Sequence, residues 1–459
     1  MKGLEREGGA NAPLRATPRD LLRVAIPSAI GAALFLVPIR FDGDITIVMG
    51  MLTSTLQALI GERMAMFTTP TFVVGAALSM VFTLGPASIK ARFPYLDSVF
   101  ETNAVWLTLR VIAGIGAPMT ALSIGPTWVN GAQTGGTAYV EIAGLIFLII
   151  GVACLLLPFL TEFGLLEFVG TLMRAPFKYI FNLPGRATID TLASWVGASS
   201  VAVLVTVRQY ESGFYSKREA AVISTNFSVV SIPFVVITSQ VAGIGEHFVA
   251  LYASMLVVGL TCAVITPRLP PLSRLTDTYY EPVGRQIHEE VTSESSPFRW
   301  AVQQAVNRAR CAPKPRAMLQ HSLKVIFDIF FTMMPAAMAI EFIALVAYHH
   351  TPVLQTLTLP LIPLLDLLQI PAAAAAAPGV VIGLLDQFVP AVIAGTIDDQ
   401  TTSFLLAGLS VTQLIFFAET AILILRSSIP LSLGQLVAIF CLRTLIALPL
   451  LAIAAHLLV

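Results

Sequence analysis

Charge is scarce in this sequence. Only 12% of its 459 residues are charged and 56% are apolar, whereas soluble domains carry roughly 25% charged residues. The shortage excludes an ordinary soluble globular fold and indicates a polytopic membrane protein. Acidic and basic residues number 27 each, so the net charge is zero, and there is no long charged tail. We therefore expect the lipid bilayer, and no nucleic acid, as a partner.

Cysteine and histidine are also few. The four cysteines are isolated in the sequence, and three of them lie within apolar segments. This is typical of small buried side chains rather than of disulfides or a metal site. The sequence has no phosphate-binding loop, no His/Glu cluster at metal-binding spacing and no nucleophile elbow. We therefore expect no enzymatic activity, no resident cofactor and no bound metal.

Long apolar runs dominate what is present. A membrane-spanning helix needs about 20 apolar residues, and the runs predict an all-α polytopic fold with about nine to ten transmembrane helices. The candidate runs are Leu21–Ile39, Ile45–Ile60, Ala65–Leu84, Ala104–Ile124, Tyr139–Leu160, Ala220–Ala242, His247–Thr266, Leu323–Ala347, Ser403–Leu425 and Leu433–His456. Proline and charge interrupt Gly164–Phe181 and Val353–Leu368, which we expect to be interfacial or tilted arms.

Basic residues predict the orientation, because lysine and arginine that flank membrane helices stay cytoplasmic. The tail 1–20 is too polar for a secretory signal peptide. This tail and the polar loop 267–318, in which Arg285–Arg310 has the pattern of a surface helix, should both be cytoplasmic. Residues 349–425 contain no lysine or arginine and should face outside. These positions agree if Asp42–Leu84 crosses the membrane only once in net terms. One of its two predicted helices would then be a half-helix, and the acidic residues at the ends of Ile45–Ile60 favour that one.

An internal repeat relates two parts of the chain. A shift of 176 residues aligns the pairs Pro176/Pro352, Leu183/Leu359, Pro184/Pro360, Asp190/Asp366 and Leu192/Leu368. The repeats would comprise residues 139–266 and 319–459, after N-terminal membrane helices at 21–138. Each contains an interrupted segment, Asp190–Val207 in the first and Leu367–Ile393 in the second. Their flanking charges predict re-entrant hairpins from opposite membrane faces, as in secondary transporters, with a pair of ordinary transmembrane helices as the alternative.

The stretch NLPGRATIDTLASWVGASSVAVLVTVRQYESGFYSKREAAVISTNFSVVS (Asn182–Ser231) resembles the Gate, or nucleoside-recognition, domain of YjiH-type membrane proteins. Such domains are similar in organisation to concentrative nucleoside transporters, in which two hairpins and two broken helices enclose the solute. The resemblance implies a multi-pass protein of the bacterial inner membrane that handles a small polar solute. It leaves open a homo-oligomer or a partner membrane protein with a Gate domain. The glutamine/glutamate pair of nucleoside transporters is replaced by Ser194-Trp195-Val196-Gly197.

Polar side chains in the apolar segments are the candidate solute ligands. An intramembrane carboxylate is costly and indicates function, and a buried amide must find a partner. The candidates are Asp190, Ser194, Ser199, Ser200, Asn226, Ser228, Asp366, Thr412, Gln413 and Glu419. Asp190 and Asp366 would bind a coupling Na⁺ or H⁺, or an amino group; the alternative is that they cap helices. For the serines the alternative is close helix packing.

Two classes of function fit these observations, and a third fits them less well. The first is a secondary transporter (permease) for a nucleoside-like or amino-acid-like solute, working by alternating access with ion coupling. The second is a non-transporting membrane scaffold, as in spore-maturation proteins that carry Gate domains. A metal-ion pore is disfavoured by the lack of cysteine and histidine among the candidates. Glu341 is a further acid within a span, and Arg110 and Arg443 are the cations that could pair with it or with Glu419.

Overall fold

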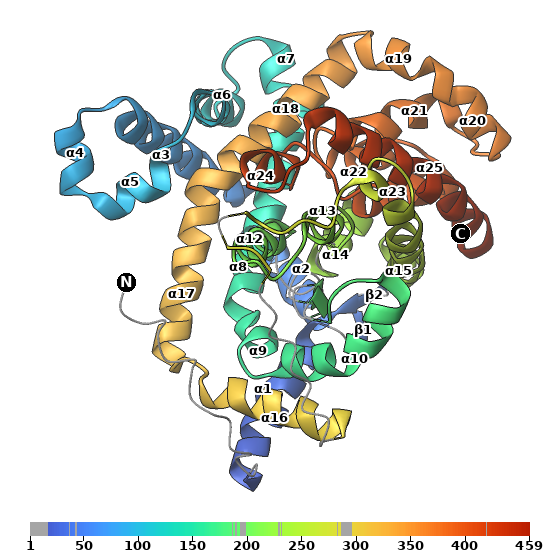
Figure 1. The fold of residues 1–459 in the computed structure, drawn as a ribbon. Coiled ribbons are helices and arrows are strands. Elements are labelled where there is room, and N and C mark those ends of the chain that lie inside the picture. The colour runs from blue at the N-terminus through green and yellow to red at the C-terminus, as the bar shows by residue number, and fades with distance from the viewer. Residues whose placement is uncertain are drawn as a thin grey trace.

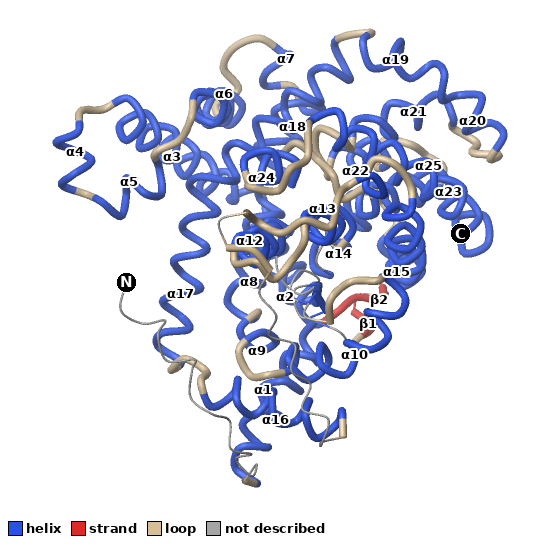
Figure 2. The backbone as a smooth tube through the Cα atoms, in the orientation of Figure 1, coloured by secondary structure: helices blue, strands red, loops and turns tan. Residues whose placement is uncertain are grey.

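The computed structural model describes residues 17–35, 37–41, 44–185, 187–188, 191–192, 199–227, 230, 232–281, 283–285, 296–418 and 420–459. These residues form an α-helical protein with one two-stranded ribbon (Figures 1 and 2). The predicted all-α polytopic class is therefore confirmed, with the small ribbon as an addition.

Six helical segments of the described chain are long and apolar enough to cross a membrane. They are Ala65–Leu84 (α3), Ala104–Ala121 (α6), Thr127–Thr161, Gly245–Arg268, Pro315–His350 and Leu433–Leu458 (α25). Three of them combine several elements: α7 (Thr127–Asn130), η2 (Ala132–Ile142), α8 (Ala143–Leu156) and α9 (Pro158–Thr161); η3 (Gly245–His247), α15 (Phe248–Ile265) and η4 (Thr266–Arg268); and α17 (Pro315–Asp328), η6 (Ile329–Met333) and α18 (Met334–His350). A helix of 20 residues is about 30 Å long, the thickness of the hydrocarbon core. The chain is thus a multi-pass membrane protein, and α3 has the bounds expected from its sequence.

The N-terminal segment differs from the expected helix pair. Helix α1 spans Pro18–Phe35, and the strands β1 (Pro38–Phe41) and β2 (Asp44–Ile47) pair antiparallel, Pro38 opposite Ile47. Proline cannot continue a helix, and the strands flank an Asp-Gly pair in the sequence, a strong hairpin signal. Helix α2 (Val48–Ile60) has 13 residues, about 20 Å of helix, so it is too short to span the bilayer alone. The turn η1 (Gly61–Met64) follows it.

Two predicted spans are each interrupted in the middle. The run Ala220–Ala242 folds as α13 (Lys217–Asn226) and α14 (Ile232–Val241). The run Ser403–Leu425 folds as α23 (Gln400–Thr412) and α24 (Thr420–Arg426). In the second break the backbone of Leu414 adopts a φ of 60°, a left-handed conformation that ends a helix. Both helices stop at polar residues, and their apolar patterns do not signal the breaks.

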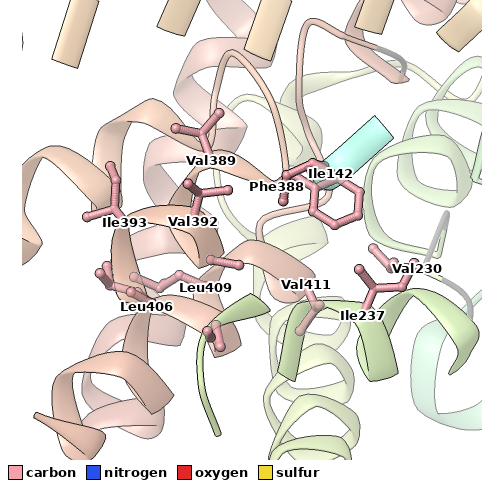
Figure 3. Close-up of a cluster of buried hydrophobic side chains, with 14 of the residues drawn as sticks. Ile142, Val230, Ile237, Phe388, Val389, Val392, Ile393, Leu406, Leu409 and Val411 are labelled. Atoms are coloured by element: carbon pink, nitrogen blue, oxygen red, sulfur yellow. The ribbon is translucent and has the colours of Figure 1, made fainter. Parts of the chain in front are cut away.

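The second interrupted segment forms a helical hairpin, which we call hairpin 2 (residues 373–394). Its helices are α21 (Ala373–Ile382) and α22 (Val389–Ala394). Pro371 and Pro378, on either side of the alanine run, predict a hairpin tip at residues 371–379. This prediction is wrong, because the alanine run is helical and the turn is at residues 383–388. Figure 3 shows Phe388, Val389 and Val392 in an apolar cluster with Leu406 and Leu409 of α23. Of the first predicted hairpin, 193–198 lie outside the described residues, and α12 covers Ser199–Glu211.

The remaining elements surround this core (Figure 1). They are α4 (Ala87–Arg92), α5 (Pro94–Phe100), α10 (Leu165–Phe181), η5 (Leu272–Arg274), α16 (Pro297–Arg310), α19 (Val353–Thr358), η7 (Leu359–Leu361) and α20 (Ile362–Leu367). Helix α16 is shorter than the predicted Arg285–Arg310 surface helix, of which 286–295 lie outside the described residues. Ion pairs hold α16 in place, from Arg308 to Glu162 at 2.8 Å and from Arg310 to Asp20 at 2.6 Å.

Candidate functional site

The two interrupted helices meet at one arginine. Arg443 of α25 is fully buried, and its Nη1 donates a hydrogen bond to Asn226 Oδ1, at the end of α13, over 2.7 Å. Its Nη2 donates to the carbonyl of Thr412, at the end of α23, over 2.6 Å. Its Nε donates to the carbonyls of Thr412 and Gln413 at 3.2 and 3.1 Å. Arg443 therefore joins the breaks in both helices.

The electrostatics of this junction follow from the helix ends. The last carbonyls of a helix lack intrahelical partners and carry a partial negative charge, which favours a cation. Arg443 supplies the cation at the C-terminal end of α23. Within the described residues no carboxylate forms an ion pair with Arg443. The suggested acid–arginine pair with Glu341 is not formed, since Arg110 bonds Ser79 Oγ and the carbonyl of Phe100 instead.

Gln413 connects the second break to hairpin 2. Its Nε2 donates to the carbonyl of Val380 in α21 at 2.8 Å and to Thr444 Oγ1 in α25 at 3.0 Å. Its Oε1 is buried and has no hydrogen-bond partner among the described residues. This oxygen lies against Gly383, where an added Cβ would be 2.0 Å away. An unsatisfied buried acceptor costs about 1–3 kcal/mol. Gln413 is thus an acceptor that a donor from a solute or a water would satisfy.

A cavity of about 680 Å³ lies where α2, η2, α8, α14 and the end of hairpin 2 come together. Small-molecule sites usually measure roughly 300–1000 Å³. The polar lining residues are Ser54, Gln57, Thr137, Glu141, Gln240 and Thr396, and the apolar ones include Met64, Val140, Ile142, Leu145, Val241 and Val392. The cavity combines hydroxyl, amide and carboxylate groups with an apolar wall.

Two of the cavity walls belong to interrupted elements. Gln240 and Val241 end α14, the second half of the first broken helix, and Val392 lies in α22 of hairpin 2. Gly395, just after hairpin 2, touches α14 so closely that an added Cβ would be 2.3 Å from the carbonyl oxygen of Val241. Movement of hairpin 2 against α14 would therefore change the shape of the cavity.

The structure brings some of the predicted site residues together. Asn226, Thr412 and Gln413 meet at Arg443, and all three are buried. Asp366 is exposed on α20 and does not line the cavity. Asp190, Ser194, Ser228 and Glu419 lie outside the described residues. Ser199 and Ser200 begin α12, and their side chains are also outside the described part.

Sequence reasoning missed the central role of Arg443 and the residues of the cavity. The signal for Arg443 was an arginine in the middle of the apolar run Leu433–His456, but it suggested a carboxylate partner rather than two helix ends. The polar cavity residues come from segments far apart in the chain. None of them stands out within its own segment.

Comparison with known proteins decides the family. The chain is 40% identical over 440 residues to the uncharacterized protein BpOF4_10220 of Alkalihalophilus pseudofirmus, covering 96% of this chain and 95% of that protein. The chain belongs to that protein's family. A profile of the Gate domain, described as nucleoside recognition, matches residues 144–245. This Gate domain extends from α8 to the end of α14 and includes Asn226 and Gln240, which confirms the resemblance seen in the sequence.

Solved structures of a concentrative nucleoside transporter are also similar to the Gate-domain protein. An outward-facing structure of a CNTnw variant has a TM-score of 0.42 at 13% identity and covers 95% of this chain and 99% of that one. An inward-facing, substrate-bound structure of CNTnw has a TM-score of 0.39 at 14% identity, covering 89% and 97%. The Gate domain itself supports a transporter rather than an enzyme.

Proposed function

We propose that this protein is a secondary transporter that moves a small polar, nucleoside-like solute across the bacterial inner membrane, with its N-terminus in the cytoplasm. The observation that carries the proposal is the cavity of about 680 Å³ bordered by both α14 and hairpin 2. Interrupted helices at membrane depth are tolerated where they are buried in protein or line a wet cavity, and they mark the substrate sites of transporters. The Gate domain match adds nucleoside recognition to this geometry.

The lining of the cavity suits a nucleoside. The hydroxyls of Ser54, Thr137 and Thr396 and the amides of Gln57 and Gln240 can exchange hydrogen bonds with sugar hydroxyls and base edges. The apolar side chains on the same walls would pack against the base. Glu141 is the single ionisable residue among the described residues that line the cavity. Because its charge would repel an anion, a neutral solute is favoured over an anionic one.

Alternating access would come from hairpin 2. In this proposal hairpin 2 moves against α14 while Arg443 keeps the ends of the two broken helices together. In addition to the cavity residues, the candidate solute or ion ligands remain Asp190, Ser194, Ser199, Ser200, Ser228 and Glu419, with Na⁺ or H⁺ as the coupling ion.

Reconstitution tests this function. Purified protein in proteoliposomes should take up at least one labelled nucleoside, with amino acids and dipeptides as comparison solutes. Ser54→Trp should fill the cavity and lower the uptake. A loss of about 1.4 kcal/mol in solute binding corresponds to about tenfold lower affinity. The matched control is Thr55→Trp, at an exposed neighbour on the same helix that is not part of the cavity lining.

Two results would contradict the proposal. One is equal uptake by the Ser54→Trp and Thr55→Trp variants, which would show that the solute does not use this cavity. The other is an absence of uptake for every solute class, together with no thermal stabilisation by any of them, which would favour a membrane scaffold.

A further inference from the structure

Glu341 is a buried acid that the site described above does not use. It lies in α18 (Met334–His350) and is fully buried, and neither of its carboxylate oxygens has a hydrogen-bond partner within the described part of the chain. Moving an ionised carboxylate into apolar surroundings without a partner costs several kcal/mol or more. The same side chain in its neutral, protonated form carries a much smaller cost. The surroundings of Glu341 therefore accommodate the protonated form.

No cation on the described elements packed against α18 offsets this acid. Helices α3, α7, α19 and α22 and the turn η6 contain no ionisable residue. Helix α6 contains Arg110, whose guanidinium bonds Ser79 and the carbonyl of Phe100. The remaining ionisable residues of α18 are Tyr348, His349 and His350 in its last turn.

Two ionisable groups on neighbouring elements interact electrostatically with Glu341. One is Tyr139 of η2, whose buried hydroxyl has no hydrogen-bond partner among the described residues. The Tyr139 ring packs against Phe342, the residue after Glu341, with ring centres 5.2 Å apart. Glu141, the other ionisable residue of η2, is exposed at the cavity.

The second group is Asp386, in the turn of hairpin 2. It is 4% exposed, its Oδ1 accepts a hydrogen bond from the backbone N–H of Phe388 at 2.6 Å, and it interacts electrostatically with Glu341. Two acids in one dry site do not both ionise readily, because each charge repels the other. The charge on Glu341 is therefore coupled to the position of the hairpin turn.

We propose that Glu341 is a proton-binding group whose protonation closes hairpin 2. When the carboxylate takes up a proton from water it becomes a neutral acid, and the turn that carries Asp386 packs against α18 as observed. When the proton leaves to water, the carboxylate repels Asp386 and favours movement of hairpin 2 away from α18. Because Val392 of hairpin 2 lines the cavity, this movement opens it. The inference rests on the proposed function insofar as the cavity is the solute site.

A proton fits this cluster better than a metal ion. Within the described residues no group of three or more His, Cys, Asp or Glu side chains can hold a metal. No described histidine, cysteine or acid joins Glu341 in such a group, whereas a hard cation takes several oxygen ligands.

Cysteine labelling tests the movement without requiring transport. In a variant that lacks the four native cysteines, Val392→Cys in the cavity wall should react with a maleimide faster at alkaline than at acidic pH, after the rate is divided by that of Thr55→Cys, an exposed site that reports the ordinary rise in thiolate reactivity with pH. Glu341→Gln mimics the protonated acid, and it should give slow labelling at every pH. Asp386→Asn removes the repelled charge and should also flatten the pH profile. The control Glu281→Gln, at an exposed loop residue, should keep the wild-type profile.

Uptake supplies the second readout. If Glu341 carries the coupling proton, a gradient of one pH unit should drive about tenfold solute accumulation in wild type, and Glu341→Gln should equilibrate the solute without accumulation.

The inference is overturned if uptake by Glu341→Gln is still driven by the gradient, or if labelling in this variant is still pH-dependent. Either result leaves the proposed transport function intact. A different outcome is that the wild type takes up no solute, while its labelling is pH-dependent and Glu341→Gln abolishes that dependence. This outcome refutes the transport function but supports the proposed role of Glu341 in the movement of hairpin 2. If Glu341→Gln does not fold, the pH profile of Val392→Cys labelling in the Asp386→Asn variant tests the inference in its place.

Discussion

The Nη1 atom of Arg443 donates a 2.7 Å hydrogen bond to the side-chain oxygen of Asn226, 217 positions earlier in the chain. Asn226 in turn donates from Nδ2 to Thr225 Oγ1 at 3.0 Å and to the carbonyl of Val222 at 3.3 Å. Because Arg443 also bonds the carbonyls at the end of α23, one guanidinium links the Gate domain to the two helices α23 and α25 of the C-terminal half.

The first prediction concerns this link. Asn226→Ala and Arg443→Met should each destabilise the protein, by about 1–3 kcal/mol for every buried partner left unsatisfied. The double variant should lose less than the sum, with a coupling of about 0.5–3 kcal/mol. Thermal or denaturant unfolding in detergent measures these values. If the losses in the free energy of unfolding are additive, the two residues are not energetically coupled.

A charge substitution at Asn226 provides the control for this comparison of the single and double variants. Asn226→Asp keeps the shape of the side chain and gives Arg443 a carboxylate partner, so it should retain more stability than Asn226→Ala. If Asn226 contacts the solute as well, Asn226→Asp should weaken solute binding while the fold is kept. Unchanged solute affinity in a stable Asn226→Asp variant would limit Asn226 to a structural role.

The second prediction concerns Gly395. An added Cβ would be 2.3 Å from the carbonyl oxygen of Val241, so Gly395→Ala must push hairpin 2 and α14 apart. Overpacking of this kind typically costs about 1–3 kcal/mol, and it should alter uptake because both elements border the cavity. The matched control is Gly434→Ala in α25, where an added Cβ meets open space. Equal stability and uptake for the two variants would show that the contact at Gly395 is not tight.

The third prediction concerns orientation. Because basic residues flanking membrane helices stay cytoplasmic, Asp398→Cys should react with an impermeant maleimide added to intact cells. Arg285→Cys in the polar loop should react only after the membrane is permeabilised. Both labelling experiments require replacement of the exposed native cysteines Cys311 and Cys441. Labelling of both sites from the same face would contradict the inverted repeat.

The fourth prediction concerns pH. The hydrogen bond from Arg310, together with bonds from Thr17, lowers the pKa of Asp20 below its ordinary value. A carboxyl with a lowered pKa in the folded state stabilises the protein above its unfolded pKa, and the contribution is lost as the pH falls toward the folded value. The wild type should therefore lose stability relative to Asp20→Asn as a melting series goes from neutral into strongly acidic pH. Parallel melting curves for the two proteins would show that the ion pair does not stabilise the fold.

The membrane class and the positions of most long helices could be predicted from the sequence. The bounds Ala65–Leu84 agree with α3, and the run Leu433–His456 lies within α25. These elements depend on local properties, since the length of an apolar run determines whether a helix can cross the bilayer. The resemblance of Asn182–Ser231 to a Gate domain was likewise visible in the residues themselves.

The breaks in the two central helices depend on tertiary structure. Ala220–Ala242 and Ser403–Leu425 are mostly apolar runs with polar residues near their centres, and these polar residues alone do not require the helices to stop at Asn226 and Thr412. A helix that stops in an apolar interior leaves carbonyls unsatisfied, and Arg443, which is distant in the sequence, satisfies those of α23. The sequence by itself determined that Arg443 and Glu341 are costly in a membrane. Only the packed structure decided that Arg443 has partners and that Glu341 has none among the described residues, because hydrogen bonding depends on which groups the fold brings within about 3 Å.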